Sequence, residues 1–282
     1  MTKKLLTNKR AKWASQRQGV AFEGAATSYP ASASAKYRAS LEALIAPMLR
    51  DYEREFAKVQ PVTQDAAPIT AANAALKSLG DKWRKRFAQQ ARTLTDRFIG
   101  RVDKHSKVTV SESLKQLSGG LTLKTPALSQ PIYNALQAAT VSNVALIKSI
   151  PTEFHAKLEK VVLNAFTGGG LGNKTILDEI RRLGTSTESR AEFIAVDQGR
   201  KITSTINAER MKAAGVKEFT WLHSGGGAEP RPLHVEYDGQ TFSYDDPPII
   251  DERTGERGLP GQLISCRCRA VPKIDFSSYL DE

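Results

Sequence analysis

Cysteine is nearly absent from this chain, which has only Cys266 and Cys268 among its 282 residues. A bridge between cysteines this close in sequence would be strained, so no disulfide is expected. The chain also lacks an apolar run of the roughly 20 residues needed to span a bilayer, and Met1 to Lys4 are followed by no apolar segment typical of a secretion signal. We therefore expect a soluble protein that is not exported by an ordinary signal and that meets a reducing cytosol.

A phosphate-binding loop is missing as well. The glycine cluster Gly168-Gly169-Gly170 lacks the Lys-Ser/Thr ending of a P-loop. It also follows a helical pattern, whereas the dinucleotide-binding motif follows a strand. The sequence therefore gives no support for a nucleotide-dependent enzyme.

Positive charge is concentrated in the first part of the chain. Residues 1–110 hold 21 Lys and Arg against 9 Asp and Glu, which gives 21 − 9 = +12, while residues 111–282 hold 20 against 21, which gives −1. A basic segment beside a near-neutral body is typical of contact with phosphate or with an acidic protein surface. The alternative is a solvated helix face, and the sequence leaves both interpretations open.

Residues 1–33 are predicted to form a flexible basic arm. They contain little apolar surface, and the stretch Ala25–Ala35 is mostly Ala, Ser and Thr, so this segment cannot bury enough to order itself. Its basic residues are candidate contacts for a nucleic acid or a protein partner: Lys3, Lys4, Lys9, Arg10, Lys12 and Arg17.

Residues 34–110 are predicted to form a basic helical hairpin. Apolar residues recur at steps of three or four from Tyr37 to Val59 and again from Leu76 to Val102, apart from one longer stride. Pro47 would kink the first helix or begin its second half. A further set of candidate contact residues falls away from the apolar seam of the second helix: Lys82, Arg84, Lys85 and Arg86.

The remainder is predicted to contain a linker at 111–130, a folded module at 131–275 and a tail at 276–282. Proline, glycine and capping residues divide the first part of the module into four helices, at about 131–149, 151–166, 173–184 and 189–214. The fold class is therefore α+β and mostly α, with a long N-terminal helical hairpin, a helical middle body and a small C-terminal antiparallel β module.

The expected β module follows from short alternating runs and turn residues. Phe219 and Trp221 alternate with polar neighbours, which predicts a short edge or hairpin strand at 217–222. Asp238-Gly239 predicts a hairpin between 233–237 and 241–244. Pro260-Gly261 suits a type II turn, after which 262–270 is predicted to be a closing strand that carries both cysteines.

The two cysteines are candidate metal ligands. If Cys266 and Cys268 lie on a strand, their sulfurs point to the same face. With His234, and with His223 as the fourth ligand, they would make the Cys₂His₂ set of a structural zinc site. Their spacing differs from that of standard zinc fingers, and small half-buried hydrophobic cysteines are the alternative. The sequence does not decide between the two.

Several uncommon elements follow one another towards the C-terminus: Trp221, Arg231-Pro232-Leu233-His234, Asp238-Gly239, Pro260-Gly261 and Cys266-Arg267-Cys268. In this order they resemble the C-terminal signature of the Mu F-like head morphogenesis family, the minor head proteins of tailed bacteriophages. The similarity covers about residues 130 to 275. One departure is Glu229, at a position where the family often has Asp.

This resemblance implies a non-catalytic virion protein, present in few copies and bound to the phage portal protein inside the capsid, after assembly in the host cytoplasm. It also implies contact with packaged double-stranded DNA and a role in head morphogenesis and in DNA packaging, retention or ejection. The major capsid or scaffolding protein is a further candidate partner, and no membrane is expected.

Two other functions are compatible with parts of the sequence. A metal-dependent nuclease, or another DNA-processing enzyme, would use a cluster built from His223, His234, Asp238, Cys266 and Cys268. A DNA-binding protein unrelated to capsids would share the basic arm but would leave the C-terminal signature unexplained.

Overall fold

The computed structural model describes residues 21–58, 67–120, 129–167, 173–226 and 229–275. Long helices dominate it, and a small antiparallel sheet follows them, which confirms the predicted α+β, mostly α class. The helices are α2 (Ala31–Ala57), α3 (Ala67–Leu117), α4 (Gln130–Thr167), α5 (Asn173–Ala213) and the short α6 (Pro232–Glu236). The strands are β1 (Ala21–Glu23), β2 (Glu218–Leu222), β3 (Thr241–Ser243), β4 (Ile249–Asp251), β5 (Glu256–Arg257) and β6 (Arg269–Asp275). No described helix combines the length and the apolar character needed to cross a membrane.

The chain divides into two compact units that do not follow the predicted boundaries. Of the described residues, one unit contains 30–58, 67–102, 136–167 and 173–199, and we call it the bundle unit. The other contains 21–29, 103–120, 129–135, 200–226 and 229–275, and we call it the sheet unit. Three of the long helices, α3, α4 and α5, contribute residues to both. Such a division is hard to predict from sequence because each unit is assembled from separate stretches of chain.

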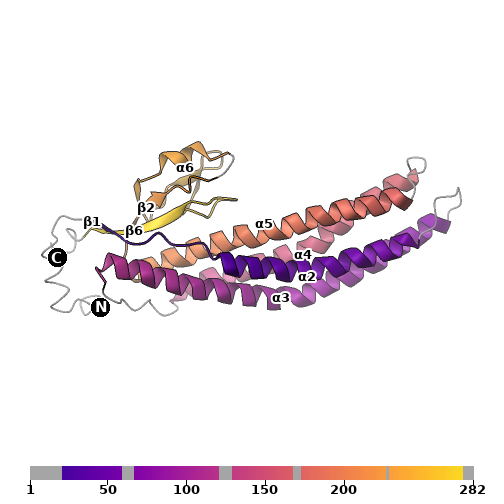
Figure 1. Ribbon diagram of the computed structural model, residues 1–282, viewed down its shortest axis with the longest axis horizontal. Helices are drawn as coiled ribbons and strands as arrows, with labels where there is room; N and C mark the ends of the chain where they lie inside the picture. Colours follow the sequence, from indigo (N-terminus) through magenta and orange to yellow (C-terminus); the bar gives the residue numbers. More distant parts are fainter. Residues whose placement is uncertain (1–20, 59–66, 121–128, 168–172, 227–228, 276–282) are drawn as a thin grey trace. The chain divides into compact units, whose positions relative to one another are not determined.

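The bundle unit consists of four helical segments with alternating directions (Figure 1). Tyr37 of α2 stacks on Phe98 of α3, with ring centroids 4.1 Å apart, while Asp51 of α2 pairs with Lys82, so these two helices are antiparallel. The Tyr37 hydroxyl donates to Asn143 of α4 at 3.2 Å, and Tyr52 contacts Phe154, so α2 and α4 run in the same direction.

The fourth segment of the bundle unit is antiparallel to α4. Asn143 of α4 donates to Gln198 of α5, and Glu153 pairs with Arg190. The four segments therefore alternate in direction along the chain, as in an up-down-up-down helical bundle. The buried α2 side chains recur at three- and four-residue steps: Tyr37, Leu41, Ile45, Met48, Tyr52 and Phe56. The first helix of the predicted hairpin, with its apolar steps from Tyr37, is thus confirmed, and it continues through Pro47.

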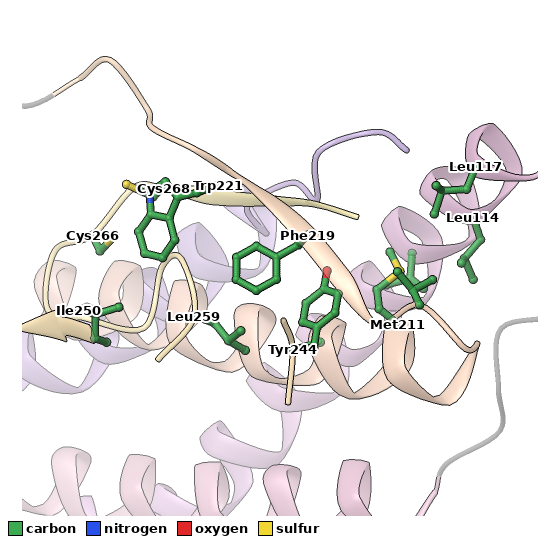
Figure 2. Close-up of a cluster of buried hydrophobic side chains, with 13 residues drawn as sticks. Leu114, Leu117, Met211, Phe219, Trp221, Tyr244, Ile250, Leu259, Cys266 and Cys268 are labelled. Carbon is green, nitrogen blue, oxygen red and sulfur yellow. The ribbon is translucent and has the colours of Figure 1, made fainter. Parts of the chain in front are cut away.

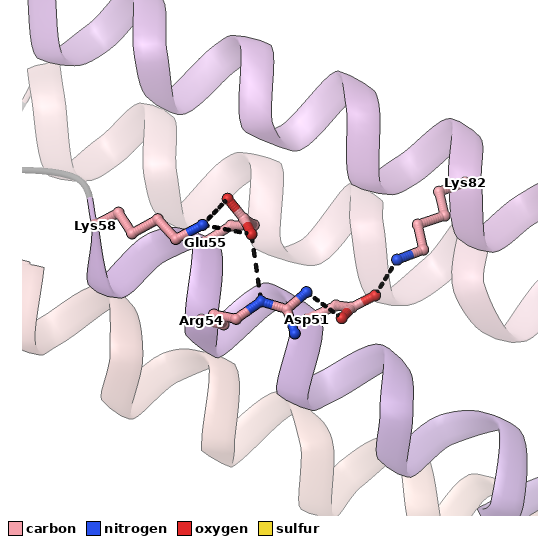
Figure 3. A network of polar contacts seen from close by, with 5 residues as sticks. All are labelled: Asp51, Arg54, Glu55, Lys58 and Lys82. Atoms are coloured by element: carbon pink, nitrogen blue, oxygen red, sulfur yellow. Dashed lines mark hydrogen bonds and ion pairs between the residues drawn. The ribbon is translucent and has the colours of Figure 1, made fainter.

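A polar network ties α2 to α3 on the surface of the bundle unit (Figure 3). Asp51 accepts from Lys82 at 2.5 Å and from Arg54 at 2.6 Å, and Glu55 accepts from Arg54 and Lys58. Burial raises the pKa of Asp51, but the hydrogen bonds from Lys82 and Arg54 outweigh it and leave that pKa below its usual value. Arg54, Lys58 and Lys82 are all more than half exposed. Ion pairs with such exposed partners contribute about 0–1 kcal/mol each, so the apolar seam rather than this network stabilises the pair of helices.

The four helices predicted at 131–214 are two helices in the structure. Thr167 ends α4, which continues through Pro151 because Ile147, Ile150 and Phe154 keep the buried face in phase across the proline. The predicted break at Gly184 is also wrong, since α5 is continuous from Asn173 to Ala213. A Cβ atom at Gly184 would lie 2.8 Å from Leu49 Cδ1, so this glycine serves a close approach of helices rather than a helix end.

Gly80 in α3 meets a neighbouring helix in the same way, and we expect Gly80→Ala to destabilise the bundle unit. A Cβ atom there would lie 2.7 Å from Cε1 and 2.8 Å from Nδ1 of His155, whose Nδ1 also lies 3.2 Å from the Tyr52 hydroxyl. Overpacking of this kind costs about 1–3 kcal/mol, which exceeds the gain of about 1 kcal/mol in helix propensity.

Gly100 in the same helix provides the matched control, because no atom lies within 4 Å of a Cβ atom built there. Urea unfolding followed by circular dichroism should show Gly80→Ala less stable than the wild type and Gly100→Ala equally or more stable. Equal stability of the two variants would contradict the close approach of His155.

The sheet unit contains a four-stranded sheet with the order β1-β6-β2-β3, in which every pairing is antiparallel. In its central pair, Trp221 lies opposite Ala270 and Leu222 opposite Arg269. The predicted strand at 217–222 is confirmed, but it is an inner strand and not an edge strand. A separate two-stranded sheet pairs β4 with β5.

Part of the predicted arm belongs to this sheet. Phe22 of β1 lies opposite Ile274 of β6, the Gly24 N–H donates to the Pro272 carbonyl, and the Ser113 hydroxyl of α3 donates to the Ala25 carbonyl. Because α2 begins at Ala31, residues 21–33 are not a flexible arm: backbone pairing supplies the order that their composition does not predict. Residues 1–20 and the tail at 276–282 lie outside the described residues.

The core of the sheet unit lies between the sheet and the segments of α3 and α5 that belong to this unit (Figure 2). Phe219 and Trp221 of β2 are both fully buried, as are Leu114 of α3 and Met211 of α5. Since α3 continues to Leu117, the first residues of the predicted linker at 111–130 are helical and contribute to this core. The part of that linker at 121–128 lies outside the described residues.

Two predictions for the β module were wrong in detail. Pro232–Glu236 is the short helix α6 and not a hairpin strand, so the turn at Asp238-Gly239 joins a helix to β3. The closing strand begins only at Arg269, which places both cysteines in the loop before it. The turn at Pro260-Gly261 is present, because Gly261 has φ 89° and the Gln262 N–H donates to the Leu259 carbonyl at 3.1 Å.

Candidate metal centre

The short helix α6 positions His234. Arg231 precedes the helix in an extended conformation, and Pro232 occupies its first turn, where the absence of an N–H is harmless. The Arg231 guanidinium donates to the Ile264 carbonyl at 2.8 Å and so ties the start of α6 to the loop that carries the cysteines. The local sequence Arg-Pro-Leu-His therefore places an imidazole beside that loop.

The loop at 259–268 positions the two sulfurs. The turn at Pro260-Gly261 reverses the chain, and Ser265 has φ 58°, which is uncommon for a residue other than glycine. The Cys266 N–H then donates to the Leu263 carbonyl at 3.0 Å. This second tight turn brings Cys266 and Cys268 to the same side of the loop although neither lies on a strand.

One histidine and two cysteines converge in the interior. Their ligand atoms, His234 Nδ1, Cys266 Sγ and Cys268 Sγ, all lie within 4.8 Å of one another. The Nδ1 atom is 3.5 Å from the Cys266 sulfur and 3.9 Å from the Cys268 sulfur. All three side chains are buried, with exposed fractions of 3%, 3% and 6%.

Neighbouring groups fix the orientation of these ligands. His234 Nε2 lies 3.0 Å from the Ile250 carbonyl, and because a carbonyl only accepts, Nε2 carries the proton and Nδ1 offers its lone pair. The Gly261 N–H donates to the Cys266 sulfur at 3.4 Å. The imidazole also packs edge-on against Trp221, with ring centroids 5.1 Å apart.

Donors also surround the second sulfur. The Trp221 indole N–H faces Cys268 and has no other hydrogen-bond partner among the described residues, and the Ser224 backbone N–H acts on the same sulfur. Figure 2 shows the indole nitrogen on the side of the ring next to Cys268. The Gly261 N–H thus donates to the Cys266 sulfur, while the indole N–H is directed towards the Cys268 sulfur.

The two thiols differ in acidity. A hydrogen bond from Cys268 lowers the pKa of Cys266 although burial raises it, and the hydrogen bond with His234 adds to the lowering. The same hydrogen bond, together with burial, raises the pKa of Cys268. The pair thus shares a proton, as expected for two buried thiols in contact.

The predicted fourth ligand lies outside this cluster. His223 Nδ1 accepts from the Gly225 N–H at 3.2 Å, and its backbone N–H donates to Asp238 Oδ1 at 2.8 Å. Neither His223 nor Asp238 belongs to the group of converging ligand atoms in the described part of the chain. Asp238 instead joins the end of β2 to the turn after α6.

The basic residues predicted to contact nucleic acid fall into two groups, one on the arm and one on α3. The six basic residues of the arm up to Arg17 precede the described part of the chain. On α3, Lys82 pairs with Asp51 and Arg84 with Asp81, while Lys85 is exposed and Arg86 lies over the Trp83 ring at 6.0 Å from its centroid. Trp83 itself is 3% exposed, so it is a core residue, as expected from its place in the apolar seam.

Some contributors to the centre could not be found from sequence. The Ile250 carbonyl and the Gly261 N–H are backbone groups, and nothing in residue type marks a carbonyl as the partner of a histidine. Trp221 was identifiable as a buried residue of a strand, but its contact with Cys268 depends on the pairing of β2 with β6.

The sequence of this same region matches a known family. Residues 156–271 match the family described as Phage Mu protein F like protein, and this stretch includes β2, α6 and all three residues of the candidate metal centre. Residues 156–271 are therefore a Mu F-like segment. The match begins later than the resemblance over about 130–275 predicted, and it confirms the family.

The Mu F-like match over residues 156–271 suggests a protein related to phage heads. The family is one of head morphogenesis, which is consistent with a role other than catalysis and with a place in the virion. The Mu F-like segment therefore supports the general function that the sequence resemblance implied.

A more distant comparison covers nearly the whole chain. A protein of Haemophilus influenzae (strain ATCC 51907 / DSM 11121 / KW20 / Rd), described as an uncharacterized protein, is 32% identical over 249 residues, which are 86% of this chain and 54% of that protein. The chain thus spans about half the length of this relative. No solved structure matches the chain.

Proposed function

We propose that this chain is a minor head protein of a tailed bacteriophage, bound to the portal protein inside the capsid. It acts in head morphogenesis and in the packaging, retention or ejection of DNA, and it contacts that DNA without sequence preference. The Mu F-like segment at 156–271 carries this proposal. The major capsid or scaffolding protein is a second candidate partner during assembly in the host cytoplasm.

The charge distribution supports the DNA contact. The excess of +12 in residues 1–110, against −1 in residues 111–282, follows from the counts of charged residues given above. Basic residues that neutralise phosphates release counterions, which gives binding that is independent of sequence and sensitive to salt. Because Lys82 and Arg84 already pair with acidic neighbours, the arm residues are the stronger candidates for this contact.

The head assignment is tested in a phage that encodes this chain. Mass spectrometry of purified, DNA-filled heads should detect the chain at few copies per head, and cross-linking should join it to the portal protein. Deletion of the gene should lower the yield of infectious particles while empty or unstable heads accumulate. The proposal would be overturned if heads of the wild-type phage lacked the chain and if deletion of the gene left the yield of infectious particles unchanged.

The DNA contact makes a separate prediction. Lys3→Gln/Lys4→Gln/Lys9→Gln should weaken binding to a random-sequence DNA duplex and should reduce the slope of log K against log salt by about 2–3, at about 0.9 per lost phosphate contact. Fluorescence anisotropy at several salt concentrations measures both quantities. The substitutions leave residues 21–33, and therefore the pairing of β1 with β6, untouched.

Three exposed lysines of α4 provide a control with the same loss of charge. Lys148→Gln/Lys157→Gln/Lys160→Gln removes three positive charges from a helix that we do not assign to DNA contact. This variant should bind with a nearly unchanged salt slope. Equal losses in the two variants would show that net charge, rather than the arm, determines the binding.

A further inference from the structure

We propose that His234 Nδ1, Cys266 Sγ and Cys268 Sγ bind one Zn²⁺ ion, which holds α6 against the loop before β6. The proposal does not depend on the phage function, because it rests on the arrangement of three buried side chains within one unit.

The distances between the ligand atoms fit a tetrahedral ion. Bonds of about 2.3 Å to sulfur and about 2.0–2.1 Å to nitrogen, at tetrahedral angles, separate a sulfur from a nitrogen by about 3.5 Å and two sulfurs by about 3.8 Å. The two sulfur–nitrogen distances observed are 3.5 and 3.9 Å, and no ligand pair exceeds 4.8 Å. An ion at the centre would need little movement of any ligand.

The imidazole is oriented to bind an ion. The proton on His234 Nε2 is donated to the Ile250 carbonyl, which leaves the Nδ1 lone pair directed at the two sulfurs, 3.5 and 3.9 Å away. A metal ion bound by all three atoms would use this lone pair and both sulfurs at once.

The groups around the sulfurs fit metal-bound thiolates. The Gly261 N–H donates to Cys266, and the buried Trp221 indole N–H, which has no other partner among the described residues, faces Cys268. Donors aimed at both sulfurs stabilise negative charge there, and two buried thiolates without a cation would be costly. Outer-shell donors of this kind, together with the Nε2–H to carbonyl bond, are typical of metal sites.

The ligand types and the burial favour a structural zinc ion. Thiolate and imidazole ligands suit zinc, whereas carboxylates and carbonyls suit magnesium or calcium. The three side chains are at most 6% exposed, so substrate has little access. The ion would join α6, the turn at 261–268 and, through the Ile250 carbonyl, strand β4, none of which is longer than a few residues.

The first experiment measures metal in the full-length chain purified under reducing conditions. Plasma mass spectrometry should find about one zinc ion per chain, and Cys266→Ser/Cys268→Ser and His234→Gln should each lose nearly all of it. His223→Ala should keep the zinc, because the His223 side chain lies outside the cluster. Retention of zinc in the double-cysteine variant, or its loss in His223→Ala, would overturn the assignment of the ligands.

A second measurement uses only the wild-type chain, in case the variants fail to fold. Removal of metal with a chelator should lower the melting temperature of the sheet unit by about 10 °C or more, and added zinc should restore it. Cobalt bound to the metal-free chain should show the absorption of a tetrahedral site with thiolate ligands. A metal-free chain that binds neither zinc nor cobalt, or one with a Cys266–Cys268 disulfide, would overturn the proposal.

Discussion

Asp103→Ala is expected to destabilise the sheet unit by about 3–5 kcal/mol, because it leaves a buried guanidinium without its counter-ion. Arg210 of α5 is fully buried and donates to Asp103 of α3 at 2.5 Å and to the Ser106 hydroxyl at 2.6 Å. Ser106 in turn donates to Asn207 at 2.5 Å. Removal of the carboxylate would leave the buried positive charge with only a neutral partner, which is the costly way to break such a pair.

Urea unfolding combined with hydrogen exchange of peptides from 103–117 and 200–213 assigns the loss to this unit. The matched control is Asp103→Leu/Arg210→Met, which replaces both partners by apolar side chains and should recover most of the lost stability. A double variant as unstable as Asp103→Ala would show that packing, and not the unpaired charge, causes the effect.

The same pair should make stability depend on pH. Burial raises the pKa of Asp103, but hydrogen bonds from Arg210 and Lys107 outweigh it, so the pKa in the folded chain is below its usual value. The contribution of Asp103 is therefore complete above the unfolded pKa of about 3.9 and is lost as the pH falls through the lower folded pKa. In Asp103→Asn the fall in stability below about pH 4 should be shallower.

Trp221→Ala is expected to cost about 3–5 kcal/mol in the same unit. Trp221 is fully buried and packs edge-on against His234, Tyr237 and Phe242, with ring centroids 5.1, 5.4 and 6.1 Å away. Truncation would remove the centre of this aromatic cluster, and the cavity would lie beside the candidate metal ligand His234. Urea unfolding monitored by circular dichroism, with hydrogen exchange of peptides from β2 and β6, measures the loss.

Phe193→Ala provides the contrasting control for Trp221→Ala. Phe193 is also aromatic, but it is 42% exposed and lies on α5 in the bundle unit. Its truncation should change stability by no more than about 0.5 kcal/mol. Comparable losses in the two variants would contradict the assignment of Trp221 as the centre of the β-module core. The stability loss of Trp221→Phe should lie between the losses of Trp221→Ala and Phe193→Ala.

The sequence by itself determined the fold class, the helical face of α2 and the family. The steps from Tyr37 to Phe56 place one apolar side chain on the same face at every turn, and this periodicity predicts a helix whatever surrounds it. The signals for strand β2 and for the Pro260-Gly261 turn were also local. Alternation of apolar and polar residues predicts a strand, and a glycine that can adopt positive φ predicts a turn, from neighbouring residues alone. The order of these elements was enough to indicate a Mu F-like protein.

Tertiary contacts decided the features for which local signals were ambiguous. Pro151 and Gly184 normally end helices, but buried side chains in phase across the first and the approach of Leu49 to the second keep α4 and α5 continuous. The mostly small residues at 21–28 do not predict order, yet their backbone pairs with β6. In each case a distant segment supplied the stabilising partner.

The candidate metal centre shows the same division. Residue type and proximity in the chain marked Cys266, Cys268 and His234 as potential ligands, but they equally suggested His223. The hydrogen bond from the Gly225 N–H to His223, the turn at Ser265 and the carbonyl of Ile250 separate the three converging ligands from the fourth candidate. Sequence could name the donors, whereas only the packing of α6 against the loop before β6 could decide which of them meet, because that contact joins residues more than thirty positions apart.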